Sequence, residues 1–534
     1  MLPSLYPHTP IQISSFQALL RNHPDQVLVY DVCYSLRHGV DIGYRGPRLS
    51  LSTPNMRSAL NNPGVIYDTI GKEISSSWSA GPFSTVPFPS CFVVSSIGVV
   101  PKKSGKFRMI TDLSRPADGV NHGIDKEDFS LQYAGVDQAI AILKRIGPDA
   151  RMCKLDIKDA FRLIPVRKED WPLLGYQWAG EYFFHTRLPF GLRSSPFHFN
   201  RVASLLAWIV GSVTHSTAIV QYLDDFWCGD TAVNCRKVFV AFQDICNKVG
   251  IPLADEKLEG PATMITFLGI QFDAASQTLA LPEGKFEEIQ QELSEWDGRK
   301  KCTKRELLSL IGKLSFAAKC VPAGRIFFRR LIDLSTRVSK LGHHLDITVD
   351  AREDLAWWIR FLPLWNGHAK FIDPVWSSTD SFDLYTDAAA SVGAGGFFRG
   401  MWFFIPWPQA IKEDDTRHIT WMELFPIVVA ARLWGSEWTE RRIMFHTDNM
   451  AVVDVWYKQG CRSPQVMSLV RHLHFVAARC NFHVSMRHIP GKSNVYADLI
   501  SRNLQVEFRR RAPHADRSPT TVPRVILQDL LPNI

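Results

Sequence analysis

The sequence predicts an α+β protein built from several domains. Its 534 residues correspond to roughly three to four domains of average size. Apolar residues make up 46% of the chain and charged residues 21%, a balance typical of folded proteins with cores. Segments with strand-like and helix-like apolar spacing follow one another without an internal repeat, and this mixture indicates an α+β organisation.

Composition narrows the class of protein further. The net charge of +8 is compatible with a polyanionic partner but does not establish one. The 10 cysteines include no C-x-x-C pair, which argues against a zinc ribbon and favours core thiols in a reducing compartment. The start lacks the pattern of a signal peptide, and the longest apolar run, 205–213, falls short of the roughly 20 residues that span a bilayer. We therefore expect an intracellular protein, cytoplasmic or nuclear, without a membrane partner.

Shifts in residue pattern divide the chain into five expected regions. The expected regions are 1–75, an irregular N-terminal extension of unknown role; 76–275, alternating strands and helices; 276–379, a helical region; 380–503, a mixed α/β region; and 504–534, a flexible basic tail that contains prolines.

Within 76–275 the apolar periodicity predicts the order of elements. Strands are expected at 91–101, 106–112, 152–157, 219–226 and 265–272, and helices at 131–146 and 238–249. A basic turn at 102–105 joins the first two strands. The pattern thus predicts a sheet whose strands are separated by helices.

The second half begins with helices and returns to mixed structure. Thr303 and Glu306 have the spacing of a capping box at the start of a helix, and Asp350 and Glu353 are expected to open another helix in a similar way. Further helices are expected at 286–296, 422–434 and 464–478, and strands at 382–386, 393–405 and 441–446.

A first set of acids follows strand-like runs. Asp156 ends one run, and the pair Asp224 and Asp225 lies between Ile219–Val220 and Phe226 in another. Burying carboxylates among such neighbours is costly unless a cation neutralises them. Oxygen ligands alone favour Mg²⁺ or Mn²⁺ over Zn²⁺. We therefore expect two such ions, about 3.5–4 Å apart, in a site for phosphoryl transfer.

Basic residues near this set suit a triphosphate. Lys102, Lys103 and Arg108 belong to the predicted hairpin at 91–112, and their side chains can bind phosphate oxygens. These residues are the expected nucleotide-binding cations.

At this point several blocks resemble one family in order and in spacing. The segment 222–225, Tyr-Leu-Asp-Asp, is similar to the Y-x-D-D signature of reverse transcriptases. The other blocks that resemble this family are 99–103 with 107–113, like the fingers; 155–161, like the first palm motif; 188–196, like the nucleotide- and template-side motif; Lys257; and 267–269, like the primer grip. A match to six blocks in order is far more specific than a match to one.

The resemblance implies a right-hand polymerase, with fingers and palm at 76–275 and thumb or connection at 276–379. It implies that Asp156, Asp224 and Asp225 bind the metal ions, and that deoxynucleoside triphosphates extend a DNA primer on an RNA template. Phe161 would be the steric gate that excludes a ribose 2′-OH, while Gly191 would admit the nucleotide. Taken alone, Phe161 would be an ordinary core residue and Lys257 a surface lysine; their joint order assigns them to the nucleotide site.

A second set of acids occurs in 380–503. Asp387 and Asp448 each end a predicted strand, Glu423 lies near a helix start, and Asp498 lies about one turn into a later helix. Any one of them would suit a cap or a surface, whereas four together can form a second cage for two Mg²⁺ or Mn²⁺ ions.

This second pattern resembles type-1 ribonuclease H, and the resemblance implies hydrolysis of the RNA strand in an RNA–DNA hybrid by Asp387, Glu423, Asp448 and Asp498. One departure is that the loop 490–494 contains no histidine, which some family members place there. Turnover is therefore expected to rely on another group or to be slower.

Segments 421–431 and 488–502 are most similar to retrotransposons of the DIRS-like kind, which use a tyrosine recombinase. On that interpretation a recombinase and capsid proteins are encoded separately. Two alternatives stay open: a domesticated or decayed copy that binds nucleic acid without catalysis, and a polymerase of the pararetrovirus type. The presence of all seven carboxylates favours an enzyme.

Overall fold

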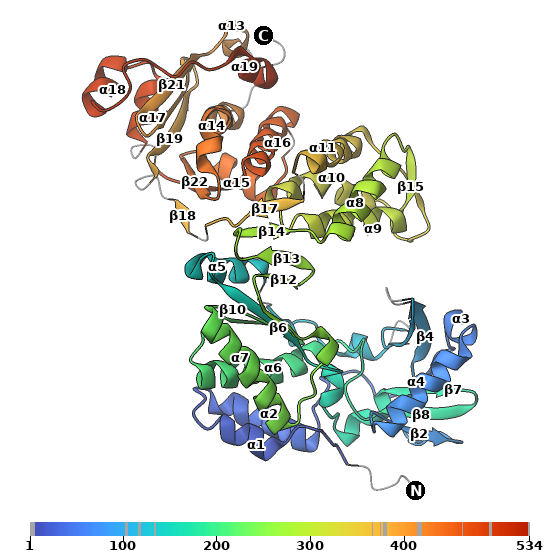
Figure 1. The fold of residues 1–534 in the computed structure, drawn as a ribbon. Coiled ribbons are helices and arrows are strands. Elements are labelled where there is room, and N and C mark those ends of the chain that lie inside the picture. Colours follow the sequence, from blue (N-terminus) through green and yellow to red (C-terminus); the bar gives the residue numbers. More distant parts are fainter. Residues whose placement is uncertain are drawn as a thin grey trace. The chain divides into compact units, whose positions relative to one another are not determined.

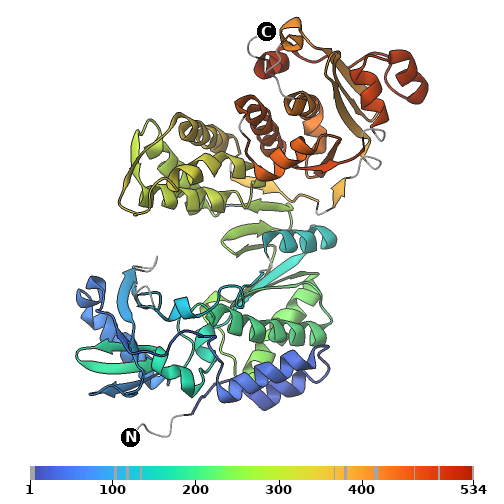
Figure 2. The same cartoon turned by 180° about the vertical axis from the view of Figure 1, so that it is seen from behind.

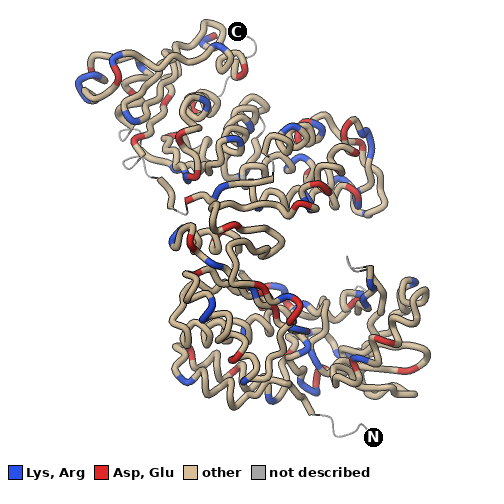
Figure 3. The backbone as a smooth tube through the Cα atoms, viewed as in Figure 1, with Lys and Arg blue, Asp and Glu red and all other residues tan. Residues whose placement is uncertain are grey.

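The computed structural model describes residues 6–101, 105–115, 119–132, 135–365, 367–373, 375–377, 382–413, 419–461, 463–490 and 494–531. The chain divides into two compact units (Figures 1 and 2). The first unit contains Met1–Ile142 and Asp149–Ile265, and the second contains Leu143–Pro148 and Thr266–Ile534. Lys and Arg are interspersed with Asp and Glu in both units (Figure 3).

The first unit combines three sheets with helices. Its helices are α1 (Ile13–Leu19), α2 (Gln26–His38), α3 (Arg57–Leu60), α4 (Pro63–Ser75), α6 (Ser195–Thr214) and α7 (Ala232–Val249), and α5 (Val136–Ile146) runs across the division between the units. Short 3-10 helices are η1 (Val120–Gly123), η2 (Ala160–Leu163), η3 (Lys168–Leu173) and η4 (Asp255–Lys257). Its strands are β1 (Leu51–Ser52), β2 (Ser79–Phe83), β3 (Val93–Val94), β4 (Ser96–Pro101), β5 (Phe107–Asp112), β6 (Arg151–Asp156), β7 (Gly175–Trp178), β8 (Glu181–His185), β9 (Ile219–Tyr222), β10 (Asp225–Asp230) and β11 (Glu259–Ala262).

Three sheets organise these strands. The order is β1-β3-β7-β8-β2 in one, β11-β6-β10-β9 in the second, and β4-β5 in a two-stranded hairpin. The strands predicted at 106–112 and 152–157 are confirmed as β5 and β6, and the hairpin predicted for 91–112 is confirmed by the antiparallel β4–β5 pair.

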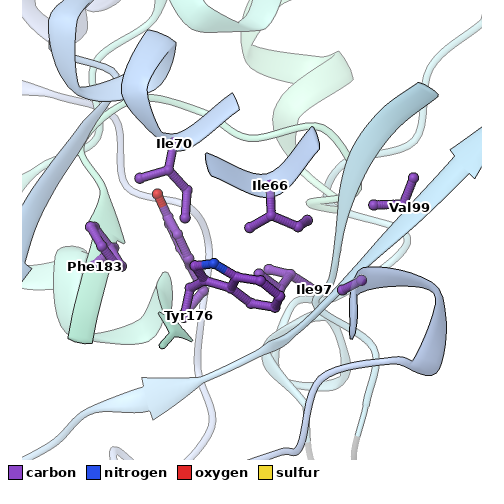
Figure 4. Close-up of a cluster of buried hydrophobic side chains, with 8 residues drawn as sticks. Ile66, Ile70, Ile97, Val99, Tyr176 and Phe183 are labelled. Atoms are coloured by element: carbon purple, nitrogen blue, oxygen red, sulfur yellow. The ribbon is translucent and has the colours of Figure 1, made fainter. Parts of the chain in front are cut away.

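The N-terminal 75 residues are not irregular, contrary to the prediction. They form α1 to α4, and α4 packs against the first unit's sheets (Figure 4). Ile66 and Ile70, four residues apart on α4, are buried with Ile97, Tyr176 and Phe183. The prolines were misleading because Pro63 occupies the first turn of α4, where a missing N–H costs nothing.

The single strand predicted at 219–226 is wrong. It is a hairpin in which β9 and β10 pair antiparallel, with Tyr222 opposite Asp225 and only Leu223 and Asp224 in the turn. Leu223 adopts φ 52°, in the left-handed region that a tight hairpin turn requires. Leu223 continues the apolar pattern into the turn, and apolar residues resume at Phe226, so the periodicity does not reveal the reversal.

The second unit contains a helical part and a mixed part. Its helices are α8 (Glu283–Trp296), α9 (Lys304–Ala317), η5 (Pro322–Phe328), α10 (Arg329–Ser335), α11 (Val349–Trp365), α13 (Gln409–Lys412), α14 (Ile419–Trp434), η6 (Gly435–Trp438), α15 (Met450–Lys458), α16 (Pro464–Arg479), α17 (Val495–Ser501), α18 (Gln505–Arg511) and α19 (Arg524–Leu530). Its strands are β13 (Ile270–Asp273), β14 (Thr278–Ala280), β15 (Lys301–Thr303), β16 (His344–Asp346), β17 (His368–Lys370), β18 (Trp376–Ser377), β19 (Leu384–Ala389), β20 (Gly393–Phe398), β21 (Met401–Pro406), β22 (Arg442–Thr447) and β23 (His483–His488), and β12 (Met264–Phe267) leads into it.

The mixed part of this unit holds two three-stranded sheets. One is the antiparallel set β19-β20-β21, and the other is the parallel set β18-β22-β23. Strands β19 and β22 are neighbours, and Asp387 of β19 lies near Asp448, which follows β22. Helix α14 packs on β19 and β20 and also on α16, while α17 packs on β19 and β20.

Two further predicted strands are also hairpins. Segment 265–272 forms β12 and β13 around Leu268 and Gly269, and segment 393–405 forms β20 and β21 around Arg399 and Gly400. All four turn residues have positive φ. The helical region is likewise interrupted by the β15–β16 hairpin and by β17.

The helix starts were predicted with mixed success. The capping box of Thr303 and Glu306 is confirmed at α9. The cap expected at Asp350 is wrong, because α11 begins earlier and the Thr348 hydroxyl accepts a hydrogen bond from the Ala351 N–H at 3.3 Å. Glu353 instead pairs with Arg330 at 2.6 Å.

The segment predicted as a flexible tail contains packed helices. Phe508 of α18 and Ala512 are buried against Phe397, Trp402 and Ile500. The prediction rested on basic and proline residues and overlooked the apolar residues between them. None of the helices in the described ranges is long and apolar enough to cross a membrane. Eight of the ten cysteines are buried, as expected for core thiols.

Candidate active sites

The first acid cluster lies on the β6–β10 strand pair. Asp156 at the end of β6 is directly opposite Asp225 at the start of β10. Asp224 lies in the hairpin turn, and its carbonyl accepts a hydrogen bond from the Ile157 N–H at 3.0 Å. Asp156 is only 4% exposed. The antiparallel register therefore brings together the three acids that the sequence singled out.

Lys257 lies within this cluster. Its Nζ donates to both carboxylate oxygens of Asp156, at 2.8 and 3.0 Å. The Ala254 N–H donates to the Asp156 carbonyl at 2.9 Å, which fixes the start of the loop that carries Lys257. Burial lowers the pKa of Lys257, but the hydrogen bond and the charges of the three acids outweigh it and raise the pKa. Lys257 is thus a resident counter-charge for Asp156.

The other two acids are harder to ionise. Burial raises the pKa of Asp225 to about 6, with further contributions from the charges of Asp156 and Asp224. Burial and the Asp156 charge also raise the pKa of Asp224. Three carboxylates that offer only oxygen donors, with the ionisation of Asp224 and Asp225 suppressed, fit a hard divalent cation, which would stabilise the charged forms.

The predicted nucleotide-binding residues are placed unevenly. Phe161, on η2, is half-buried, with its ring 5.0 Å from that of Phe190. Arg108 is exposed on β5, opposite Val100. Lys102 and Lys103 lie outside the described residues.

Gly191 has a clear steric role. Its φ is +94°, and a Cβ there would lie 3.1 Å from the Thr111 carbonyl oxygen. The buried Asn121 holds this loop: its Nδ2 donates to the Gly191 carbonyl at 2.9 Å, and its Oδ1 accepts from the Arg193 N–H at 2.8 Å. Sequence reasoning missed Asn121, because nothing local links it to a loop 70 residues away.

The second acid cluster lies in the second unit. Asp387 of β19, Glu423 of α14 and Asp448 after β22 each offer a ligand oxygen, and these oxygens lie within 4.8 Å of one another. Glu423 is 9% exposed, whereas Asp448 faces solvent. The arrangement is a cage with one open side.

The fourth acid, Asp498 on α17, lies next to this cage. Its charge contributes to the raised pKa of Asp387, and Arg502 Nε donates to its carboxylate at 2.7 Å. Ser501, one turn further along α17, donates to Asp387 Oδ2 at 2.7 Å. Sequence reasoning missed Ser501, whose role depends on a partner 114 residues away.

A glycine lets α17 approach. Gly395 of β20 is opposite Asp387, and a Cβ at this position would lie 2.6 Å from the Ile500 side chain and 2.9 Å from the Ser501 backbone nitrogen. Only a residue without a side chain fits between the sheet and the helix. Gly395 therefore sets the distance between Asp387 and the helix that carries Asp498.

The second cluster resists ionisation more strongly than the first. Burial raises the pKa of Glu423 to about 8, and the charges of Asp387 and Asp448 add to this effect. Burial also raises the pKa of Asp387 to about 6, although the Ser501 hydrogen bond opposes it. The acid-only donor set fits Mg²⁺ or Mn²⁺ here as well.

Comparisons with known proteins agree with the position of the first cluster. Residues 100–272 match the family model described as reverse transcriptase (RNA-dependent DNA polymerase). The chain is 20% identical over 417 residues to the genome polyprotein of Petunia vein clearing virus, covering 77% of this chain and 18% of that protein. It is 24% identical over 226 residues to the transposon Tf2-3 polyprotein of Schizosaccharomyces pombe, covering 42% of this chain and 15% of that one.

The solved structures that the chain matches include a foamy viral protease-reverse transcriptase in complex with RNA/DNA hybrid. That match has a TM-score of 0.49 and 14% identity, and it covers 92% of this chain and 65% of that chain. Among the polyproteins compared above, the chain spans less than a fifth of the length of each.

Proposed function

We propose that the protein extends DNA primers on RNA templates. Its residues 100–272 form a reverse transcriptase region of the kind found in retroelement and pararetrovirus polyproteins. The observation that carries the proposal is the opposition of Asp156 and Asp225 on β6 and β10, with Asp224 in the adjoining turn. Inside the matched region, this is the place where divalent ions would be held.

The residues of the cluster divide the work. Two Mg²⁺ ions, when bound, would neutralise charge and lower the pKa of the attacking primer hydroxyl. Asp156, Asp224 and Asp225 would hold them, and Lys257 donates a hydrogen bond to Asp156 in their absence. Phe161 would bar a ribose 2′-OH by its bulk, and Gly191 leaves room for the nucleotide beside Thr111.

Primer extension by the purified chain tests this proposal. With Mg²⁺, a primed RNA template and deoxynucleotides, we expect extension that falls by at least about 1000-fold in Asp224→Asn, because one metal ligand is lost. Asp244→Asn, which removes an exposed acid on α7, is the matched control and should extend normally. Undiminished extension by Asp224→Asn would contradict the assignment.

We further propose that the second cluster hydrolyses the RNA strand of RNA–DNA hybrids, as a ribonuclease H-like domain following a polymerase with a thumb or connection at 276–379. The supporting observation is the cage of Asp387, Glu423 and Asp448, with Asp498 beside it. Asp448 on the open side is accessible to a substrate.

Hybrid cleavage with a labelled RNA strand tests the second activity. Asp448→Asn should abolish cleavage while leaving primer extension intact, and the change is exposed enough to leave folding unaffected. Asp454→Asn on α15, also exposed, is the control. Unchanged cleavage by Asp448→Asn would refute the site, and loss of both activities would show that the two sites are not separable.

A non-catalytic role as a nucleic-acid-binding protein is the competing proposal. It predicts hybrid binding that weakens steeply with salt, without extension or cleavage by the wild-type chain. For the branch of retroelement, we propose the DIRS-like kind on the segments 421–431 and 488–502. A tyrosine recombinase in a neighbouring reading frame would support that branch, and a pararetroviral gene order would contradict it.

A further inference from the structure

The turn that carries Phe161 is held by the N-terminal helix α4. This turn begins at Asp159, whose φ of 51° is unusual for a residue with a side chain, and continues as η2. Two adjacent residues of α4 with opposite charges form ion pairs with residues of this turn. Lys72 Nζ lies 3.8 Å from Asp159 Oδ2, and Glu73 Oε1 pairs with the Arg162 guanidinium.

The inner pair is part of a buried polar network. Glu73 is 6% exposed and Arg162 5%. The Ser79 hydroxyl donates to Glu73 Oε2 at 2.6 Å, and His185 Nδ1 lies 3.2 Å from the same oxygen. Since a buried charge without its partner is costly, Glu73 and Arg162 constrain each other's position strongly.

The same network reaches the other side of the proposed nucleotide site. His185 Nε2 lies 3.5 Å from the Thr111 hydroxyl, and the carbonyl of Thr111 is the atom that a side chain at Gly191 would meet. Glu73 is therefore connected both to the Phe161 turn and to the backbone beside Gly191. Helix α4 precedes the residues that match the family model, which begin at 100.

We propose that Lys72 and Glu73 are positioning residues that hold the Phe161 turn in the position in which the Phe161 ring excludes ribonucleotides. This inference rests on the proposed polymerase function. It gives the N-terminal segment a role in substrate selection. Phe161 would exclude the ribonucleotide, and helix α4, about 90 residues earlier in the chain, holds the Phe161 turn through the Arg162–Glu73 contact.

The test compares single-nucleotide extension with a deoxynucleotide and with the matching ribonucleotide, using the full chain. Glu73→Gln should lower the ratio of the two kcat/KM values by about 10-fold, mainly through a lower KM for the ribonucleotide. Glu73→Asp should restore part of the ratio. Asp159→Asn, which keeps a residue that tolerates positive φ, should lower it by about 3-fold. Asp68→Asn, an exposed acid on α4, is the control and should change nothing.

Hydrogen exchange gives a reading that is independent of activity. Amides of residues 160–164 should exchange at least about 10-fold faster in Glu73→Gln than in the wild type or Asp68→Asn. A folded Glu73→Gln with wild-type discrimination and wild-type exchange overturns the proposal. If Glu73→Gln does not fold, the Glu73→Asp and Asp159→Asn ratios decide. A wild-type chain that extends no primer refutes the proposed function and the selection role with it, while exchange still shows whether α4 holds the turn.

Discussion

Both acid clusters hold carboxylates close together, and they reduce the repulsion between the negative charges by different means. In the first unit, Lys257 donates to both oxygens of Asp156, so a positive side chain stands among the three acids. In the second unit, Arg502 forms an ion pair with Asp498 beside the cage, and its charge lowers the pKa of Asp387 only in part. Glu423 is left among carboxylates, and its pKa rises to about 8. One cluster is thus compensated by a lysine and the other by a proton.

This difference has a consequence for metal binding. At neutral pH a cation that enters the second cluster must displace a proton from Glu423, whereas one that enters the first competes with Lys257 for Asp156. We therefore expect metal affinity to depend on pH more steeply at the second cluster. The geometry differs as well: the first cluster uses a hairpin turn, and the second needs α17 to dock against β20.

Among the changes that test this contrast, the largest effect should come from undoing that docking. Gly395→Ala places a Cβ against Ile500 and the Ser501 nitrogen, so α17 must move and carry Asp498 and Ser501 away from Asp387. We expect hybrid cleavage to fall by about 100-fold, as displacements near 1 Å do in other sites, with primer extension retained. Gly312→Ala on α9, where a Cβ meets open space, is the control. Normal cleavage by Gly395→Ala would show that α17 is not needed in place.

A buried acid outside both clusters sharpens the contrast. Burial acts against the charge of Glu73, but Arg162 and His185 lower its pKa to about 2. This folded-state pKa lies below the unfolded value, so the stabilisation is present above about pH 4.5 and is lost as the pH falls towards 2. In urea unfolding at neutral pH, Glu73→Gln should be less stable than wild type by about 2 kcal/mol, and the deficit should shrink below pH 4.5.

Glu423 should show the opposite sign in metal-free buffer. Because its folded-state pKa is raised, its contribution to stability is present at low pH and is lost as the pH rises through about 8. Glu423→Gln should therefore gain stability relative to wild type as the pH increases. The same trend with pH in both variants would mean that the two glutamates are not held in different ionisation states.

A smaller effect should follow from removing the resident lysine. Lys257→Met leaves the three acids without the cation that donates to Asp156. Since the lysine side chain is 52% exposed, solvent screening limits the loss of metal-free stability to about 1 kcal/mol. Thermal unfolding with and without Mg²⁺ measures it: Mg²⁺ should stabilise Lys257→Met more than wild type. Lys248→Met, an exposed change on α7, should respond to Mg²⁺ as wild type does. An equal response in all three would contradict a counter-charge role.

Much of the candidate site could be predicted because its acids follow apolar runs. Asp156 ends β6 as expected, and the antiparallel register of β6 and β10 then brings Asp225 opposite Asp156. Asp387 was also expected to end a strand, but β19 continues for two residues beyond it. Asn121 and Ser501 could not be found in this way, because each acts on a group far away in the chain. A polar residue acquires such a role only through tertiary contacts.

Turns hidden within predicted strands account for one group of errors in the predicted fold. Three hairpins were hidden, with non-glycine residues at positive φ beginning the turns: Leu223, Leu268 and Arg399. Two of these turns offered a following glycine, but the first, Leu223–Asp224, offers no such signal. The N-terminal helices were missed because the apolar residues of α4 are buried only by tertiary contacts with β4 and β7.

The smallest effect on stability is expected from a change in the β9–β10 turn, which carries Asp224 of the first cluster. Leu223 holds φ 52°, a conformation that costs a residue with a side chain about 1 kcal/mol and costs glycine little. Leu223→Gly removes this strain but adds backbone freedom to the unfolded chain, so we expect a net stabilisation of no more than about 0.5 kcal/mol by urea unfolding. Asp224 and Asp225 should keep their positions, and extension should stay within about 3-fold of wild type. A large loss of extension would mean that the leucine side chain itself supports the acids, and the turn would then resemble the second cluster in needing a packed neighbour to hold its ligands.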